Sequence, residues 1–483
     1  MEGDPGRRER DRDLWFSAAL FLLALVPRLY VALAWPREPV WDGHYYDFGA
    51  RRIAEGLGYS DDVVLGGRTV WHPWCHYPVG YSGFLAVFYS LFGAGPRTGP
   101  VVNAVVGALT AVLVHRLARF ATTTTRSRVA GALTAVHPGL IAYTALLMTE
   151  PLAGFGLLLA AWLFVRDRDR PLRAGALSGL VIGLSTLVRP PSLLLAPALI
   201  FFTCKGFTSK GTGAADGGGR LGPWPRRLLG PAAACAFALL AVLPWTLRNC
   251  RVMDGCALVS TNAGWNLMIG AFPRATGRFE TIRATDGCPI VTGQVQQDRC
   301  WMDTGLSHIA ADPWRWLALA PKKLAHTFDH ESFPIGYLGE ANPPEWPEAR
   351  KERGRAVLGG AHRFLLSVAA LAAVPFPRLS RDRKSLLSWA ALLLVLSLVV
   401  LGLTADSHPF WPLALAAALL PALPLSSPER RDGVIAYLAF LVGSVAAVSV
   451  VFFGEDRYHM VASPAICLLA ACALRSPPRA ARQ

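Results

Sequence analysis

The chain has 483 residues, of which 53% are hydrophobic and 17% charged, and its mean hydropathy is +0.35. This composition excludes an ordinary soluble domain, in which about 25% of the residues are charged. The net charge of +15 comes mostly from arginine in the loops between apolar runs, and we expect membrane lipids but no nucleic acid as partners. The apolar runs recur from Leu14 to Leu474, each close to the roughly 20 residues that a helix needs to cross hydrocarbon. We therefore predict an all-α polytopic membrane protein.

About twelve membrane spans are predicted from the apolar runs. They lie near residues 14–35, 99–120, 128–147, 150–165, 174–188, 190–203, 228–246, 357–376, 385–404, 408–424, 433–453 and 461–474. The apolar stretch Val79–Phe92 is short, and counting it as a span would invert every later loop. We expect it to be an interfacial or re-entrant helix. The chain then divides into an N-terminal transmembrane module (1–246), an extracytoplasmic loop region (247–356) and C-terminal transmembrane helices (357–483).

The basic residues of the loops predict the orientation. With the N-terminus in the cytoplasm, the alternate loops that carry clusters of Arg and Lys all fall on the cytoplasmic side, as the positive-inside rule requires. These clusters begin at Arg7, Arg116, Arg166, Lys205, Arg378, Arg430 and Arg475. Two long outer segments remain, the first outer loop (36–99) and a second from about 248 to 356. Residues 206–223 are rich in Gly and predict a flexible cytoplasmic linker.

Asp42 lies just after the first apolar run, in an acidic and aromatic segment that runs from Trp41 to Asp47. A carboxylate at this point stands where the bilayer ends and a polar substrate can arrive. It therefore indicates chemistry at the membrane surface. The alternative is a solvated Asp that caps a short helix.

Four cysteines, Cys250, Cys256, Cys288 and Cys300, fall in the second outer loop. An even number of cysteines in an oxidising compartment predicts disulfides, and three pairings are open. The alternative is that they are free thiols that pack as small hydrophobic side chains. Cys75 in the first outer loop is left over.

A metal site is weighed in the second outer loop, where His326 and His330 are four residues apart and Asp329 and Glu331 lie beside them. No third ligand is evident, and the segment also has the pattern of an interfacial amphipathic helix. We therefore assign no metal ligands. His137, before Pro138, is predicted to be a packed or hydrogen-bonded core histidine.

Several short motifs follow one another in a characteristic order. They are Asp42-Gly-His-Tyr-Tyr46, Ala54-Glu-Gly-Leu-Gly-Tyr59, His76-Tyr-Pro-Val-Gly-Tyr81, Leu91-Phe-Gly93, Thr149-Glu150-Pro151-Leu152, the run from Gly179 to Arg189-Pro190, Pro244-Trp-Thr-Leu-Arg248-Asn249, Ser260-Thr-Asn-Ala-Gly-Trp-Asn266 and Phe453-Gly-Glu-Asp-Arg457-Tyr458-His459. In this order the chain resembles the glycosyltransferase family 39 group of bacterial membrane enzymes, relatives of protein O-mannosyltransferases and of the lipid A aminoarabinose transferase.

The resemblance implies a GT-C fold with an active site between the first outer loop and the bilayer. It implies transfer of a sugar from a polyprenyl-phosphate donor to a lipid, glycan or protein acceptor by a single inverting displacement. Asp42 matches the catalytic carboxylate, which would deprotonate the acceptor hydroxyl. The motifs add candidate substrate contacts at Tyr46, Asp47, His76, Glu150, Asn249, Tyr458 and His459.

The chain departs from the family pattern directly after Asp42. The family often has an acidic pair there, whereas Gly43 follows Asp42 in this chain. Asp47 could supply the second carboxylate. The departure weakens any metal assignment, so no cofactor is certain and a divalent metal ion stays open. The resemblance also implies the cytoplasmic (inner) membrane of a bacterium, with the active site on the extracytoplasmic side.

Arg189, Arg248 and Arg457 are the candidates to hold the donor phosphate. Each lies at the outer end of a predicted span, which the positive-inside rule does not explain. A guanidinium group offers a planar fork that suits phosphate oxygens. The alternative is that each snorkels to the interface as an ordinary end of a span.

Two other functions are weighed. A transporter or flippase of lipid-linked glycans should show charged residues deep within several spans, and many transporters also have internal repeats. The ionisable groups here lie mostly at span ends. A membrane assembly factor without catalysis would need neither Asp42 nor the outer arginines. In the favoured interpretation, disulfides hold the second outer loop as a lid, with Asn262, Gly264 and Asn266 near the acceptor.

Overall fold

The structure is a computed structural model that describes residues 5–35, 38–203, 224–289, 293–375, 380, 382–422 and 432–474. Helices form almost all of its regular structure, which confirms the predicted all-α class. The predicted linker at 206–223 lies outside the described residues, as do Arg378, Arg430 and Arg475.

Seven described helices are long and apolar enough to cross a membrane. They are α1 (Pro5–Ala34), α4 (Thr98–Ala118), α8 (Pro171–Val188), α10 (Trp224–Val252), α16 (Glu348–Ala373), α17 (Arg383–Thr404) and α19 (Gly433–Val451). The other predicted spans appear as shorter or broken helices: α5 (Thr124–Val136) with α6 (Pro138–Ala142), α7 (Glu150–Arg166), η2 (Pro190–Leu194) with α9 (Leu195–Ala198) and η3 (Leu199–Phe202), α18 (Trp411–Leu419) and α20 (Ser463–Ala471). The count of about twelve spans therefore stays a prediction.

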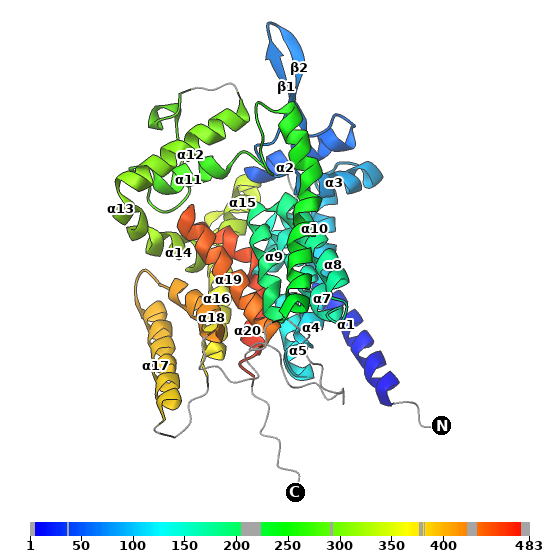
Figure 1. The fold of residues 1–483 in the computed structure, drawn as a ribbon, viewed down its shortest axis with the longest axis vertical. Coiled ribbons are helices and arrows are strands. Elements are labelled where there is room, and N and C mark those ends of the chain that lie inside the picture. The colour runs from blue at the N-terminus through cyan, green and yellow to red at the C-terminus, as the bar shows by residue number, and fades with distance from the viewer. Residues whose placement is uncertain are drawn as a thin grey trace.

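The two predicted outer segments gather at one end of the molecule (Figure 1). The first contains α2 (Asp42–Ala54), the antiparallel hairpin β1 (Ser60–Leu65) and β2 (Arg68–Pro73), and α3 (Val79–Phe92). The second contains α11 (Ala263–Ala271), α12 (Gln294–Ala311), α13 (Pro313–Ala318), α14 (Ala320–Phe328) and α15 (Phe333–Ala341). The hairpin stands at the top of Figure 1, whereas α5 and the beginning of α1 lie at the bottom. The short six-residue turn η7 (Asp456–Val461) follows α19.

Helices α8 and α10 touch along their backbones. A side-chain carbon added at Gly175, Gly179 or Gly183 would lie 2.1, 2.3 or 2.5 Å from a backbone carbonyl oxygen of α10. The glycines are four residues apart, so they form one stripe on α8. Small residues at this spacing are typical of membrane helices that approach closely. The two helices therefore form a closely fitted pair.

The predicted span at 128–147 is broken at His137-Pro138. Proline has no N–H and disfavours a helical conformation in the residue before it, so α5 ends at Val136 and His137 is extended. His137 Nδ1 accepts a hydrogen bond from the backbone N–H of Leu140 at 3.2 Å, as predicted for a hydrogen-bonded core histidine.

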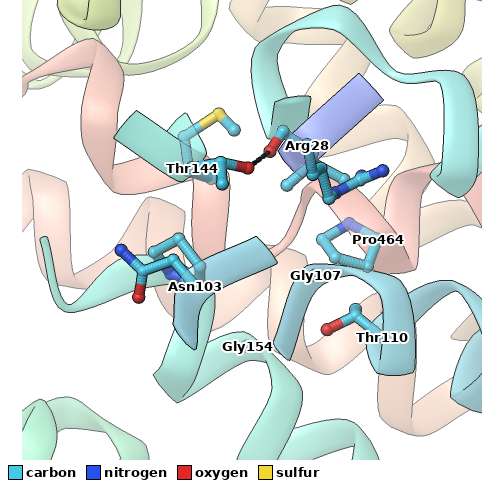
Figure 2. Close-up of a pocket in the computed structure, with 10 residues that line it drawn as sticks. Arg28, Asn103, Gly107, Thr110, Thr144, Gly154 and Pro464 are labelled. Carbon is cyan, nitrogen blue, oxygen red and sulfur yellow. Dashed lines mark hydrogen bonds between the residues drawn. The ribbon is translucent and has the colours of Figure 1, made fainter. Parts of the chain in front are cut away.

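The fully buried Arg28 of α1 caps this break. Its guanidinium donates to the carbonyl oxygens of Thr134 (3.0 Å) and Ala135 (2.7 Å), which lie in the last turn of α5. Carbonyls at a helix end inside a membrane need such a partner. Figure 2 shows Arg28 with Gly107 and Pro464 beside it, at a pocket of about 20 Å³ that has room for one water molecule.

The predicted disulfides of the second outer loop are confirmed. Cys250 pairs with Cys256 and Cys288 pairs with Cys300, which is one of the three pairings that the sequence left open. Cys75 is free and buried.

Candidate active site

A cavity of about 670 Å³ lies where the outer segments meet the membrane helices. Its polar end is lined by Asp42, Tyr46, His76, Tyr77, Glu150, Arg189, Asn262, Asn266, Arg457 and Tyr458. Its apolar walls come from the broken helix after α8, from α10 and from the end of α19, and include Leu193, Leu194, Pro197, Leu239, Val448 and Phe452. The cavity therefore joins charged groups to a hydrocarbon-like surface.

Asp42 is the first residue of α2 and faces the polar end of the cavity. The residue before it, Trp41, has a φ of 52°, a conformation that non-glycine residues rarely adopt. The Trp41 ring packs edge-on against Tyr337, with ring centroids 5.7 Å apart, and lies 5.5 Å from the ring of Phe333. These contacts of α15 hold the unusual turn and so fix where the Asp42 carboxylate points.

Both oxygens of the Asp42 carboxylate are bonded. Oδ1 accepts from the Tyr77 hydroxyl at 2.9 Å, and Oδ2 forms an ion pair with Nη1 of Arg457. Burial raises the pKa of Asp42, but the Arg457 guanidinium and the Tyr77 hydroxyl outweigh it, so the pKa lies below its ordinary value. Asp42 is therefore ionised at neutral pH.

Arg457 forms a second ion pair with Glu455, which follows α19. Burial raises the pKa of Glu455 to about 7, against the lowering effect of Arg457. The side chains of Arg457 and Asp42 are 13% and 24% exposed, so a molecule in the cavity can reach both. Among the described residues, Nη2 of Arg457 has no hydrogen-bond partner.

A second ion pair lies at the same polar end of the cavity. Glu150 begins α7, where a helix N-terminus favours a carboxylate, and its Oε1 accepts from Nη1 of Arg189 at 2.7 Å. The Glu150 side chain is only 1% exposed, whereas that of Arg189 is 19% exposed. The Tyr458 ring contacts both guanidinium groups, with its centroid 4.9 Å from Cζ of Arg189 and 5.3 Å from Cζ of Arg457. This aromatic ring holds two cations near each other at the polar end of the cavity.

His76 also faces this end, with its ring 5.0 Å from that of Tyr77 and 6.0 Å from that of Trp265. Burial lowers the pKa of His76, and the nearby Asp42 carboxylate only partly offsets this. His76 is therefore neutral at pH 7 and can donate or accept one hydrogen bond.

Four predicted contact residues do not line the cavity. Asp47 accepts from Arg51 and Tyr89, both at 2.6 Å, on another face of α2. The idea that Asp47 supplies a second carboxylate beside Asp42 is thus corrected. His459 is fully buried instead, with Nδ1 2.7 Å from the carbonyl oxygen of Thr327 and Nε2 3.1 Å from Oε2 of Glu331.

The side chains of Arg248 and Asn249 form hydrogen bonds with backbone carbonyls of the outer segments. Arg248 donates to the carbonyl oxygens of Tyr59 (2.8 Å) and Trp74 (3.0 Å) and so ties α10 to the first outer loop. Asn249 is fully buried and donates to the carbonyl of Ala257 at 3.1 Å, beside the Cys250–Cys256 bridge. The predicted donor contact of this pair is corrected to a structural role in the outer segments.

Tyr77 and Trp265 line the cavity but were not predicted as site residues from the sequence. Both stand inside motifs that carried the family resemblance, beside His76 and between Asn262 and Asn266. A tyrosine next to a histidine in an aromatic loop has no distinctive spacing, so only the fold reveals that Tyr77 reaches Asp42. Of the three predicted acceptor-side residues, Asn262 and Asn266 line the cavity, whereas Gly264 lies against α12, where a side-chain carbon would be 1.9 Å from the carbonyl oxygen of Asp298.

The carboxylates of this cavity do not fit a divalent metal ion. Arg457 and Tyr77 occupy both oxygens of Asp42, and Arg189 occupies one oxygen of Glu150. The guanidinium groups of Arg189 and Arg457 lie directly beside these carboxylates and would repel a further cation. The arrangement can instead bind an anion at the arginines and accept a proton at Asp42.

Residues 76–209 match the family model described as dolichyl-phosphate-mannose-protein mannosyltransferase. The predicted resemblance is confirmed. The matched segment holds His76, Glu150 and Arg189, whereas Asp42 and Arg457 lie outside it. A comparison with curated proteins gives no match.

Two kinds of solved structure resemble the fold. The Archaeoglobus fulgidus oligosaccharyltransferase, tethered with an acceptor peptide, is 13% identical with a TM-score of 0.47, over 95% of this chain and 49% of that chain. This chain thus spans about half the length of the archaeal protein. ArnT from Cupriavidus metallidurans, bound to undecaprenyl phosphate, is 15% identical with a TM-score of 0.36, over 90% of this chain and 77% of that chain. At such scores no residue role is taken from either structure.

Proposed function

We propose that the protein is a membrane glycosyltransferase that takes a sugar, a hexose or a pentose, from a polyprenyl-phosphate donor and passes it to an acceptor at the extracytoplasmic face. The observation that carries the proposal is the cavity itself. An ionised carboxylate and two guanidinium groups stand at one end, and apolar walls continue from them. A lipid phosphate needs both surfaces at once. The family model that matches residues 76–209 is itself described by a dolichyl-phosphate sugar donor.

In this proposal Arg189 and Arg457 hold the donor phosphate. Each guanidinium uses one or two of its five N–H groups within the protein and keeps others for a ligand. Phosphate oxygens suit such forked donors, and the isoprenoid chain would lie along Leu193, Leu194 and Leu239. The positive charges also stabilise the phosphate as it leaves with the bonding electron pair.

Asp42 is the proposed base. The acceptor oxygen attacks the anomeric carbon, the bond from that carbon to the phosphate oxygen breaks, and the acceptor proton passes to Asp42. A single displacement of this kind inverts the anomeric centre. Because Asp42 is ionised at neutral pH, it can accept the proton. The neutral His76 and the side chains of Asn262 and Asn266 supply hydrogen bonds for sugar or acceptor hydroxyls.

The three proposed regions each contribute. Asp42, Glu150 and Arg189 belong to the N-terminal module (1–246), Asn262 and Asn266 to the loop region (247–356), and Arg457 to the C-terminal helices (357–483). The proposed location is the cytoplasmic membrane of a bacterium. This location rests on the arginine-rich segments that are predicted to face the cytoplasm. Two of them, at the beginning of α1 and at α5, lie at the end of the molecule away from the hairpin (Figure 1).

A flippase should keep charged groups deep within its spans, and Arg28 is one such group. However, Arg28 is used by the carbonyls of Thr134 and Ala135, which gives it a structural purpose. It therefore does not favour transport over transfer.

The test is sugar release from polyprenyl-phosphate donors by the full chain in lipid nanodiscs. A panel of radiolabelled hexosyl and pentosyl donors would be supplied together with a bacterial envelope extract as the source of lipid, glycan and protein acceptors, and formation of free polyprenyl phosphate measured. Asp42→Asn should abolish release, whereas Asp47→Asn, on another face of α2, should retain it once correct folding is verified. Wild-type turnover in Asp42→Asn would remove this residue from the mechanism. No release from any donor would refute the proposed function.

Donor binding is tested separately. Arg189→Ala and Arg457→Ala should each weaken binding of a polyprenyl-phosphate sugar by about 1.5–3 kcal/mol, the worth of a hydrogen bond to a charged group. Arg248→Ala is the matched control, because this arginine is used by Tyr59 and Trp74. Equal losses in all three variants would contradict the assignment.

A further inference from the structure

Three buried side chains from separate segments meet outside the cavity. Glu331 lies between α14 and α15, His362 on α16 and His459 on η7, and they are 1%, 2% and 0% exposed. Oε2 of Glu331 is 3.1 Å from Nε2 of His459 and 3.9 Å from Nδ1 of His362. One ligand atom from each residue lies within 4.8 Å of the other two. The sequence argument considered Glu331 but found no third ligand, because His362 and His459 lie far from it along the chain.

The remaining ring nitrogens fix the tautomers. Nδ1 of His459 is 2.7 Å from the carbonyl oxygen of Thr327, and Nε2 of His362 is 2.9 Å from that of Phe328. A carbonyl oxygen only accepts, so these two nitrogens carry the hydrogens. In a neutral ring the other nitrogen then presents a lone pair. The lone pairs of both histidines therefore converge on the Glu331 carboxylate with no hydrogen of their own between them.

The surroundings supply no balancing cation. Among the described residues no Lys or Arg pairs with Glu331, and its buried Oε1 has no hydrogen-bond partner. Gly139 leaves room for this carboxylate, since a side-chain carbon there would be 1.5 Å from Oε1. A buried, unpaired carboxylate is costly, and buried charges are ordinarily paired or bound to metal.

We propose that Glu331, His362 and His459 form a zinc site. Two imidazole nitrogens and one carboxylate oxygen are a common zinc ligand set, whereas calcium and magnesium favour oxygen ligands alone. Zinc would take the two lone pairs and the carboxylate charge together. Backbone carbonyls that hold the second nitrogen of each histidine are the usual outer partners of metal-bound histidines.

The site would join the outer loop region to two membrane elements. His459 lies two residues after Arg457, and the neighbouring Asp456 accepts from the backbone N–H of Phe333 at 2.8 Å. The metal would thus hold η7 against the segment that begins α15. It would act as a positioning element for η7, and it stands independently of the proposed transfer reaction.

Cobalt binding to the full chain in detergent tests the site. After treatment with a chelator, Co²⁺ should bind at one ion per chain and give visible d–d absorption without a thiolate charge-transfer band, because no cysteine belongs to the cluster. Zinc should displace it and raise the unfolding temperature. His362→Gln and His459→Gln should weaken binding on the order of 100-fold or more, whereas His308→Gln on α12 should not change it.

Two results would overturn the proposal. One is a wild-type protein that binds no more cobalt or zinc than the His362→Gln and His459→Gln variants do. The other is a thiolate band, which would place the ion at a cysteine. If a variant does not fold, the stoichiometry and spectrum of the wild-type protein decide. If the metal site is refuted in this way, a proton shared between Glu331 and His459 would account for their contact.

Discussion

Gly43→Ala probes why no second acid follows Asp42. A side-chain carbon at position 43 would lie 2.2 Å from Oη and 3.1 Å from Cζ of Tyr337, and 3.2 Å from the carbonyl oxygen of Leu147. Over-packing of this kind costs about 1–3 kcal/mol. Alanine in a helix is more favourable than glycine by about 0.5–1 kcal/mol, so we expect a net loss of about 0–2.5 kcal/mol. Because Gly43 adjoins Asp42, sugar release should fall as well.

Tyr337→Phe supplies the rescue. It removes Oη and the 3.2 Å hydrogen bond from the Val40 backbone N–H, at a cost of about 1 kcal/mol. In the double variant the added carbon no longer meets Oη, and only the contacts with Cζ of residue 337 (3.1 Å) and the carbonyl oxygen of Leu147 (3.2 Å) remain. The double variant should therefore recover most of the loss, with a coupling of about 1–2 kcal/mol. The free energy of unfolding would be measured by SDS titration in mixed micelles.

Gly83→Ala in α3 is the matched control, because a side-chain carbon there meets nothing within 4 Å. It should be neutral or slightly stabilising. The reasoning is refuted if Gly43→Ala is as stable as Gly83→Ala, or if Tyr337→Phe gives no rescue.

Three further outcomes are expected. Arg189→Ala leaves the buried Glu150 without its cation and should lower the free energy of unfolding by about 3–5 kcal/mol. Adding Glu150→Gln to this variant should restore most of that loss. Simple additivity of the two changes in unfolding free energy would contradict the prediction. Burial raises the pKa of Glu455 from its ordinary 4.5 to about 7, so its contribution to stability is complete below pH 4.5 and is lost as the pH rises through 7. Relative to Glu455→Gln, the wild-type unfolding free energy should therefore fall across this range, and parallel pH profiles would argue against it. Cys288→Ser removes a disulfide between residues 12 apart and should lower the free energy of unfolding by about 3 kcal/mol. Peptide mapping that finds Cys300 alkylatable in the native wild-type protein would disprove the disulfide.

The sequence predicted those residues at the polar end of the cavity whose position relative to a membrane helix already places them near the membrane surface. Glu150 and Arg189 stand at the ends of apolar helices and Asp42 follows one closely, and such positions meet at the membrane surface. Asp47 shows the limit of this reasoning. Five residues further along a helix is a rotation of about 140°, so Asp47 turns away from Asp42 toward Tyr89.

Contacts between distant segments could not be predicted in the same way. Arg248 stands at a helix end like Arg189, but the carbonyls of Tyr59 and Trp74 take its guanidinium. Nothing in the spacing of these residues signals that contact. Likewise, His362 reads as one histidine in an apolar helix, and only the packing of α16 against the outer loop region brings it to Glu331.

The glycine stripe between α8 and α10 bears on how a lipid would enter. At these three glycines, carbonyl groups of α10 approach the backbone of α8 directly, and no α8 side chain stands between them that could change rotamer and open a gap. The two helices should therefore behave as one rigid wall. A bulky isoprenoid chain would have to pass on another side, and the broken segment Pro190–Phe202 is the adjoining stretch whose short helices can shift separately. Under the proposed function, the rigid wall would set the direction from which the lipid donor reaches the cavity.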